Sequence, residues 1–161
     1  MKIEHLSKPT LSGEFEELKF DAVGDCEWFK FSPDEREDWV GVFGCGDTGE
    51  TLSVLSFDNT FALVFSRGKG YALDIASRSL LFKVEDILFQ QGGSQIPNTS
   101  RVLIFDIDSL YIYDRDGQVW EHIFENVDGI RNLCITADSI SGEAYHLYYP
   151  NEKWISFTVP Y

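Results

Sequence analysis

The sequence has little basic charge. Its 13 Lys and Arg stand against 27 Asp and Glu, which gives a formal net charge of −14. A surface of this charge repels the phosphates of nucleic acids and anionic membrane surfaces. We therefore expect no nucleic-acid partner and no membrane partner, and any macromolecular partner is expected to be a basic protein.

Cysteine is also scarce, and long apolar runs are missing. The three cysteines, Cys26, Cys45 and Cys134, are widely spaced and include no C-x-x-C pair, which is the spacing typical of zinc sites and redox couples. No apolar run has the length of a signal peptide or a membrane span. These absences predict a cytoplasmic protein with free thiols, no metal and no cofactor.

The common catalytic motifs are missing as well. The sequence contains no G-x-S-x-G, no H-E-x-x-H and no phosphate-binding lysine loop, and its three histidines are scattered. Residues 44–49 match G-x-G-x-x-G, but a strand-like run follows at 51–57 where a dinucleotide site requires a helix. We interpret this segment as a glycine-rich connection and predict a non-enzymatic protein.

Aromatic residues, by contrast, are abundant, with 13 Phe, 7 Tyr and 4 Trp. Short apolar and aromatic runs alternate with turn residues about every eight to twelve positions, a pattern typical of all-β proteins. We expect a single β-rich domain over residues 1–161, mostly antiparallel and more than about 40% strand. The predicted strands are 26–31, 39–43, 51–57, 60–66, 70–75, 79–82, 101–107, 110–114, 119–124, 131–136, 143–149 and 153–159.

Two segments predict a minor helical content. Ser32-Pro33-Asp34-Glu35 combines a serine N-cap, a proline at the first helical position and a glutamate three residues after the cap. Residues 83–91 place three apolar side chains at helical spacing before Gly92, although part of this segment also fits a strand.

An internal repeat appears at an offset of 40 residues. It aligns 60–85 with 100–125 without gaps and pairs Leu63 with Leu103 and Phe65 with Phe105. The period is that of four-stranded propeller blades, although two successive meanders produce the same repeat. We favour an antiparallel β-sandwich or a curved meander sheet and leave open blade-like repeats at 60–85 and 100–125, with these four side chains buried.

The acidic residues are unevenly distributed. Residues 11–50 hold twelve acidic residues against three basic ones, with aromatic residues between them. A negative surface with aromatic anchors fits a basic protein partner. The predicted partner-binding residues are Glu16, Glu17, Trp28, Asp34, Glu35, Glu37, Asp38 and Trp39, with Trp28 or Trp39 at the apolar centre.

In its size, acidity and lack of catalytic motifs, the chain resembles the single-domain immunity proteins of bacterial toxin systems. The resemblance implies an inhibitor that binds a cognate basic toxin, such as a nuclease. Two alternatives remain open: a β-rich adaptor or regulatory subunit of a larger assembly, and a small-molecule-binding β-fold.

The cysteine pattern yields a direct prediction. All three cysteines should react with an alkylating reagent under non-reducing, denaturing conditions, because a reducing compartment does not oxidise widely spaced thiols. Mass spectrometry of the intact protein counts the adducts. Fewer than three would contradict both the free thiols and the predicted compartment.

Overall fold

The chain folds into β-strands joined by turns. The computed structural model describes residues 1–9, 13–34, 36–47, 51–84, 91–147 and 152–161, and none of these residues is helical. Strands make up 63% of the described residues. The all-β prediction is confirmed.

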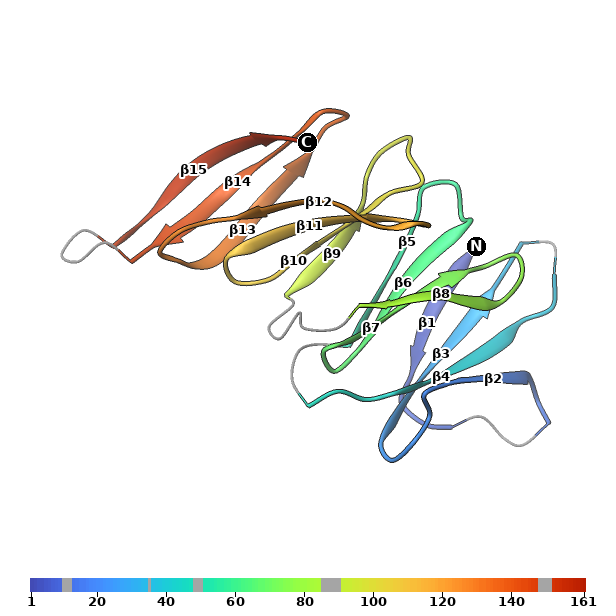
Figure 1. Ribbon diagram of the computed structural model, residues 1–161. Coiled ribbons are helices and arrows are strands. Elements are labelled where there is room, and N and C mark those ends of the chain that lie inside the picture. The colour runs from blue at the N-terminus through green and yellow to red at the C-terminus, as the bar shows by residue number, and fades with distance from the viewer. Residues whose placement is uncertain (10–12, 35, 48–50, 85–90, 148–151) are drawn as a thin grey trace.

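The strands form four separate sheets, which we call blades 1 to 4 in chain order (Figure 1). Their strand orders are β1-β3-β4-β2, β5-β6-β7-β8, β9-β10-β11-β12 and β13-β14-β15. The bounds in blades 1 and 2 are β1 Lys2–Leu6, β2 Glu16–Phe20, β3 Cys26–Ser32, β4 Trp39–Gly44, β5 Leu52–Leu55, β6 Phe61–Ser66, β7 Lys69–Asp74 and β8 Ser79–Val84. Those in blades 3 and 4 are β9 Gly92–Gln95, β10 Val102–Phe105, β11 Ser109–Asp114, β12 Gly117–Ile123, β13 Val127–Ile135, β14 Ser139–His146 and β15 Lys153–Pro160.

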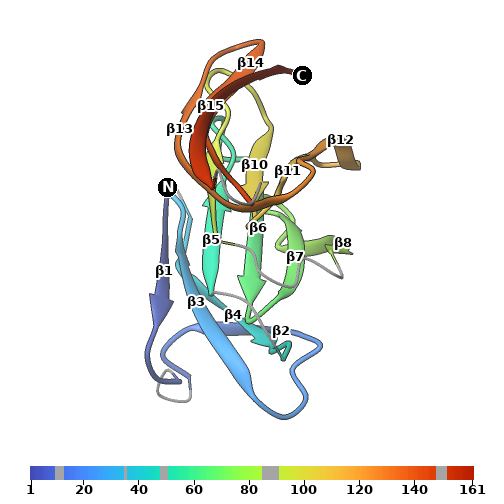
Figure 2. The ribbon, with the colours of Figure 1, turned by 90° about the vertical axis from the view of Figure 1, so that its left-hand side faces the viewer.

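The blades follow one another as layers, and Figure 2 shows the succession from the side. Among the arrangements that the sequence left open, the structure therefore adopts the blade-like one. The 40-residue repeat corresponds to the last three strands of blades 2 and 3. Leu63, Leu103 and Phe65 are fully buried and Phe105 is partly buried, so the predicted burial is confirmed.

The helix predictions are corrected where the structure describes them. Ser32 ends β3 and pairs with Lys2 of β1, so the capping pattern there starts a turn rather than a helix. Lys83 and Val84 belong to β8, and residues 85–90 of the second predicted helix lie outside the described residues. Strands β1, β2 and β9 were not predicted.

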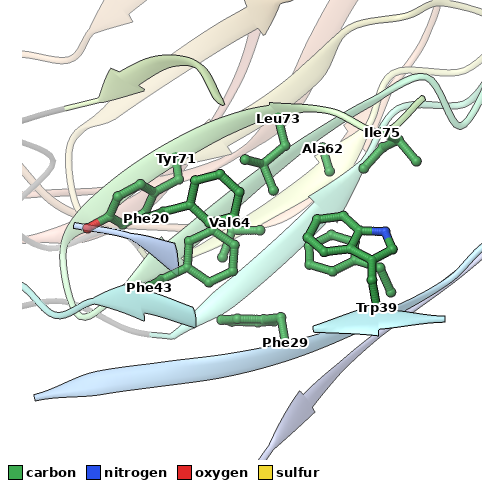
Figure 3. Close-up of a cluster of buried hydrophobic side chains, with 10 residues drawn as sticks. Phe20, Phe29, Trp39, Phe43, Ala62, Val64, Tyr71, Leu73 and Ile75 are labelled. Atoms are coloured by element: carbon green, nitrogen blue, oxygen red, sulfur yellow. The ribbon is translucent and has the colours of Figure 1, made fainter. Parts of the chain in front are cut away.

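Apolar side chains hold each pair of successive blades together. One cluster lies between blades 1 and 2 (Figure 3), a second between blades 2 and 3, and a third between blades 3 and 4. In the first cluster the indole of Trp39 stacks on the ring of Phe31, with 4.0 Å between ring centroids, and both side chains are fully buried.

Polar contacts also connect neighbouring blades. The Tyr71 hydroxyl of blade 2 donates to the Gly44 carbonyl of blade 1 at 2.8 Å, and burial raises the pKa of this phenol to about 12. The Arg115 guanidinium of blade 3 pairs with Asp74 of blade 2. The backbone N–H of Ser77 is the main cause of the lowered pKa of Asp74, and Arg115 lowers it further.

Replacing the buried Trp39 should destabilise the protein more than replacing an exposed tryptophan. Trp39→Ala should lower the free energy of unfolding by about 3–5 kcal/mol, because it leaves a cavity between blades 1 and 2. Trp154→Ala is the matched control, since Trp154 is 36% exposed. Urea denaturation measures both losses, and an equal loss for the two variants would contradict the role of inter-blade packing.

Candidate protein-binding surface

Blade 1 has one face against blade 2 and a second face that no other blade covers. In β4, Trp39 and Phe43 point into the cluster shared with blade 2. Side chains alternate along a strand, so Val40 and Val42 point to the other face. Both are nonetheless buried, at 0% and 5% exposure, and their cover has to come from blade 1 itself.

The connection between β1 and β2 lies on this face, where Pro9 and Phe15 line the same cavity as Val42. The first strand of the blade, β1, pairs with β3, whereas β2 lies at the opposite edge and runs parallel to β4. A parallel neighbour at the far edge requires a crossover connection. The described parts of this crossover, residues 7–9 and 13–15, bring Pro9 and Phe15 next to the sheet.

Two neighbouring cavities share the walls made by Pro9 and Phe15, and we call them together the blade 1 groove. The larger measures about 480 Å³ and the smaller about 380 Å³. The larger is lined by Pro9, Gly13, Phe15, Glu17, Lys19, Ala22, Cys26, Trp28 and Val42. The smaller is lined by Glu4, Leu6, Ser7, Lys8, Pro9, Glu14, Phe15 and Lys30.

Lys30 links the aromatic and acidic parts of the groove. Its ammonium lies 4.5 Å from the centroid of the Phe15 ring and 2.8 Å from an Asp38 carboxylate oxygen. The hydrogen bond between them raises the pKa of Lys30 and lowers the pKa of Asp38. Both groups are therefore held in their charged forms.

Cys26 is the thiol in the larger cavity. Burial raises the pKa of this thiol, and the neighbouring Cys45 and Asp25 raise it further. A raised pKa keeps the sulfur protonated near neutral pH, and a protonated thiol is a poor nucleophile. The groove is therefore better suited to noncovalent binding than to thiol chemistry.

The structure brings only some of the predicted partner-binding residues together. Glu17 and Trp28 line the larger cavity, and Asp38 reaches the groove through Lys30. Glu16 pairs with Arg78 of blade 2, and the Glu37 carbonyl accepts a hydrogen bond from the same arginine.

For two further predicted acids, Asp34 and Glu35, the structure shows no place in the groove. Asp34 is exposed and pairs with the ammonium group of Met1 at 2.7 Å. Glu35 lies outside the described residues.

The prediction for Trp39 is wrong. Its side chain is fully buried between blades 1 and 2, so it cannot form the centre of a docking surface. Both faces of β4 are apolar, and sequence alternation alone does not show which face meets blade 2. Trp28 takes the role of the accessible tryptophan, since it lines the larger cavity.

Several acids of the segment 11–50 are engaged inside the molecule. In addition to Glu16, Asp21 pairs with Lys83 and Asp25 with Arg67 at 3.7 Å, and all three bases belong to blade 2 or its turns. The acidic excess of this segment thus partly serves the contact between blades 1 and 2. Its remaining acids include the groove residues Glu14 and Glu17.

Sequence reasoning missed Phe15, Pro9 and Lys30 as groove residues. Their placement depends on the parallel pairing of β2 with β4, which joins segments separated by more than twenty positions. Phe15 is one of the aromatic residues that lie between the acids of residues 11–50.

The described part of the chain was also compared with the requirements of a metal site and of a membrane-spanning helix. It contains no group of three or more His, Cys, Asp or Glu side chains placed to hold a metal ion. Within the same residues no helix is long and apolar enough to cross a membrane.

Comparisons with known proteins support the architecture. No family model and no curated protein matches the sequence. Among solved structures, the chain is similar to a hydrazine synthase from Kuenenia stuttgartiensis, with 10% identity, a TM-score of 0.51, and coverage of 94% of this chain and 49% of that one.

Two further structures are also similar. The β-propeller domain of Cps50 (Swd1) from Myceliophteria thermophila is 9% identical, with a TM-score of 0.50 and coverage of 84% and 52%. BamB from Moraxella catarrhalis is 15% identical, with a TM-score of 0.49 and coverage of 89% and 46%. The chain spans about half the length of these structures, and its four blades have a β-propeller-like fold.

The pair between Lys30 and Asp38 gives a prediction about the groove. In Lys30→Met the pKa of Asp38 should rise toward its ordinary value, because the hydrogen bond from Lys30 is the main cause of the lowered pKa. In the native protein the ionised carboxylate stabilises the fold at pH values above its ordinary pKa, and this stability is lost as pH falls through the lowered pKa. Carbon NMR titration of the carboxyl group measures the change.

Lys19→Met is the control, since Lys19 lines the groove but is not among the groups that shift the pKa of Asp38. If the pKa of Asp38 in Lys30→Met equals that in the native protein, the hydrogen bond from Lys30 is not the cause of the lowered pKa.

Proposed function

We propose that the protein is a non-enzymatic binding module of a larger assembly, and that it holds a basic segment of a partner protein in the blade 1 groove. The observation that carries this proposal is the pair of cavities that share the walls made by Pro9 and Phe15 and are lined by aromatic and charged side chains. Two neighbouring hollows suit two anchor side chains of one extended segment. Aromatic anchors with charged surroundings are typical of protein interfaces.

Charge supports a basic partner. The net charge of −14 attracts cationic proteins over distances longer than a contact and raises their association rates. The groove is lined by three acids, Glu4, Glu14 and Glu17, and by three lysines, Lys8, Lys19 and Lys30. Lys30 is paired with Asp38, and Glu4 with Lys2. Glu14 and Glu17 offer carboxylates to the basic side chains of a bound segment.

A toxin would be one specific form of such a partner. The resemblance to immunity proteins predicts a basic nuclease, and the net charge of −14 would attract it for the same electrostatic reason. This remains a prediction, whereas the adaptor function requires only a basic binding partner within an assembly. Inhibition of a nuclease encoded beside this chain would distinguish the toxin partner from other partners.

Affinity capture from the native host tests the proposal. The immobilised protein should retain one or more basic proteins at low salt, and Glu14→Gln/Glu17→Gln should reduce their recovery about tenfold, because it removes two of the groove's negative charges. Quantitative mass spectrometry compares the bound proteins. Trp28→Ala should reduce the same proteins through loss of the aromatic wall.

Asp116→Asn/Glu125→Gln is the matched control, because it removes two exposed negative charges from blade 3 and its flanking turn. Equal losses with this control would indicate attraction by net charge alone. A capture that does not change in either groove variant would place the partner elsewhere.

A further inference from the structure

The floor of the blade 1 groove is a face of the sheet, not an edge. Leu6 of β1, Trp28 of β3, Val42 of β4 and Lys19 of β2 are successive cross-strand partners, and all four line the groove. Cross-strand partners direct their side chains to the same face of a sheet. Both β3 and β4 have a neighbouring strand on each side, so their backbone groups are used within the sheet. Strand addition, which needs a free edge, does not fit this floor.

A ridge stands above the floor. Pro9 and Phe15 of the crossover line both cavities, so the two hollows have a common wall. The ammonium of Lys30 lies 4.5 Å from the centroid of the Phe15 ring and helps to hold it in place. An amphipathic helix presents its apolar side chains as one continuous stripe and needs a continuous groove. Two hollows with a common wall fit a helix poorly.

The walls of the larger cavity suit proline. They include the rings of Phe15 and Trp28 and the side chains of Pro9, Ala22 and Val42. Pro9 is exposed and both aromatic side chains are partly buried, so these surfaces are accessible to a ligand. Proline packs against such walls without losing side-chain rotamer entropy, because its ring has almost none to lose. Aromatic-lined grooves are the usual sites for proline-rich segments.

Proline-rich segments adopt the polyproline II conformation, an extended helix with three residues per turn and no internal hydrogen bonds. Residues three positions apart therefore lie on the same side of the segment. The backbone carbonyls remain available to a hydrogen-bond donor, and Trp28 carries one in its indole N–H. Little conformational entropy is lost on binding, because the conformation exists before contact.

We propose that the segment bound in the blade 1 groove is basic and proline-rich and binds in the polyproline II conformation. Two prolines three positions apart enter the two cavities, on either side of the wall made by Pro9 and Phe15. This inference rests on the proposed binding function and specifies the composition and conformation of the ligand.

Charge and proline have different parts in this recognition. The net charge of −14 favours a basic segment over an acidic one, and Glu14 and Glu17 offer carboxylates to its lysine or arginine side chains. Lys8 and Lys19 line the groove as well, so the charge of the lining alone does not select the segment. Specificity therefore comes mainly from the prolines.

Three fluorescently labelled peptides test the proposal. The first has prolines three positions apart with lysines between them, the second has alanine in place of each proline, and the third has glutamine in place of each lysine. In fluorescence anisotropy the first should bind the full chain saturably, and the other two at least about tenfold more weakly. The indole N–H signal of Trp28 in NMR spectra should shift on addition of the first peptide.

Variants locate the site. Trp28→Ala removes a wall of the larger cavity and should weaken binding of the first peptide at least about tenfold. Trp154→Ala is the matched control, because Trp154 is 36% exposed and belongs to blade 4. It should bind the peptide as the native chain does. The comparison of the three peptides on the native chain does not depend on these variants.

Different outcomes would overturn the two proposals. Equal binding of the first and second peptides, weakened equally by Glu14→Gln/Glu17→Gln, would keep the groove as a site for basic segments and exclude polyproline II recognition. Equal losses in Trp28→Ala and Trp154→Ala would exclude the groove as the peptide site. Saturable binding of none of the three peptides would overturn this inference, whereas capture from the native host tests the proposed function separately.

Discussion

The apolar contact between successive blades is the constraint on which the rest of the structure depends. Blade 2 has to be apolar on both faces because it lies between two neighbours. Its strand β6 is fully buried, with Ala62 and Val64 in the cluster with blade 1 and Phe61, Leu63 and Phe65 in the cluster with blade 3. Exposing either face would cost roughly 25 cal/mol for each Å² of apolar surface.

In the described residues, blades 1 and 4 each have a face that no other blade covers. The side chains on this face differ between the two blades. In blade 1 the crossover to β2 lies over Val42, and the cavities beside this crossover form the groove. In blade 4 the corresponding face is polar: Ser156 and Thr158 are exposed, and Arg131 pairs with Glu143 while covering Trp154. The blade 1 groove thus lies on the face of blade 1 that points away from blade 2.

Local sequence patterns predicted most strands and the equivalence of blades 2 and 3. Alternating apolar residues and turns identified most strands, and the repeat identified the equivalent strands of blades 2 and 3. The pairing of Ser32 with Lys2 and that of β2 with β4 are long-range contacts, which no local pattern reports. They account for the wrong helix at Ser32 and for the missed groove residue Phe15. Trp39 was misplaced because β4 is apolar on both faces.

Long-range contacts also show that the acids of residues 11–50 do not form one surface patch. Counted along the sequence, its charges form one patch, but Glu16, Asp21 and Asp25 pair with bases of blade 2. These exposed pairs add little stability individually and are screened by salt. Their main effect is to neutralise the side of blade 1 that meets blade 2. Packing between blades therefore determines which acids of the segment are paired inside the molecule, although the acids themselves contribute little to that packing.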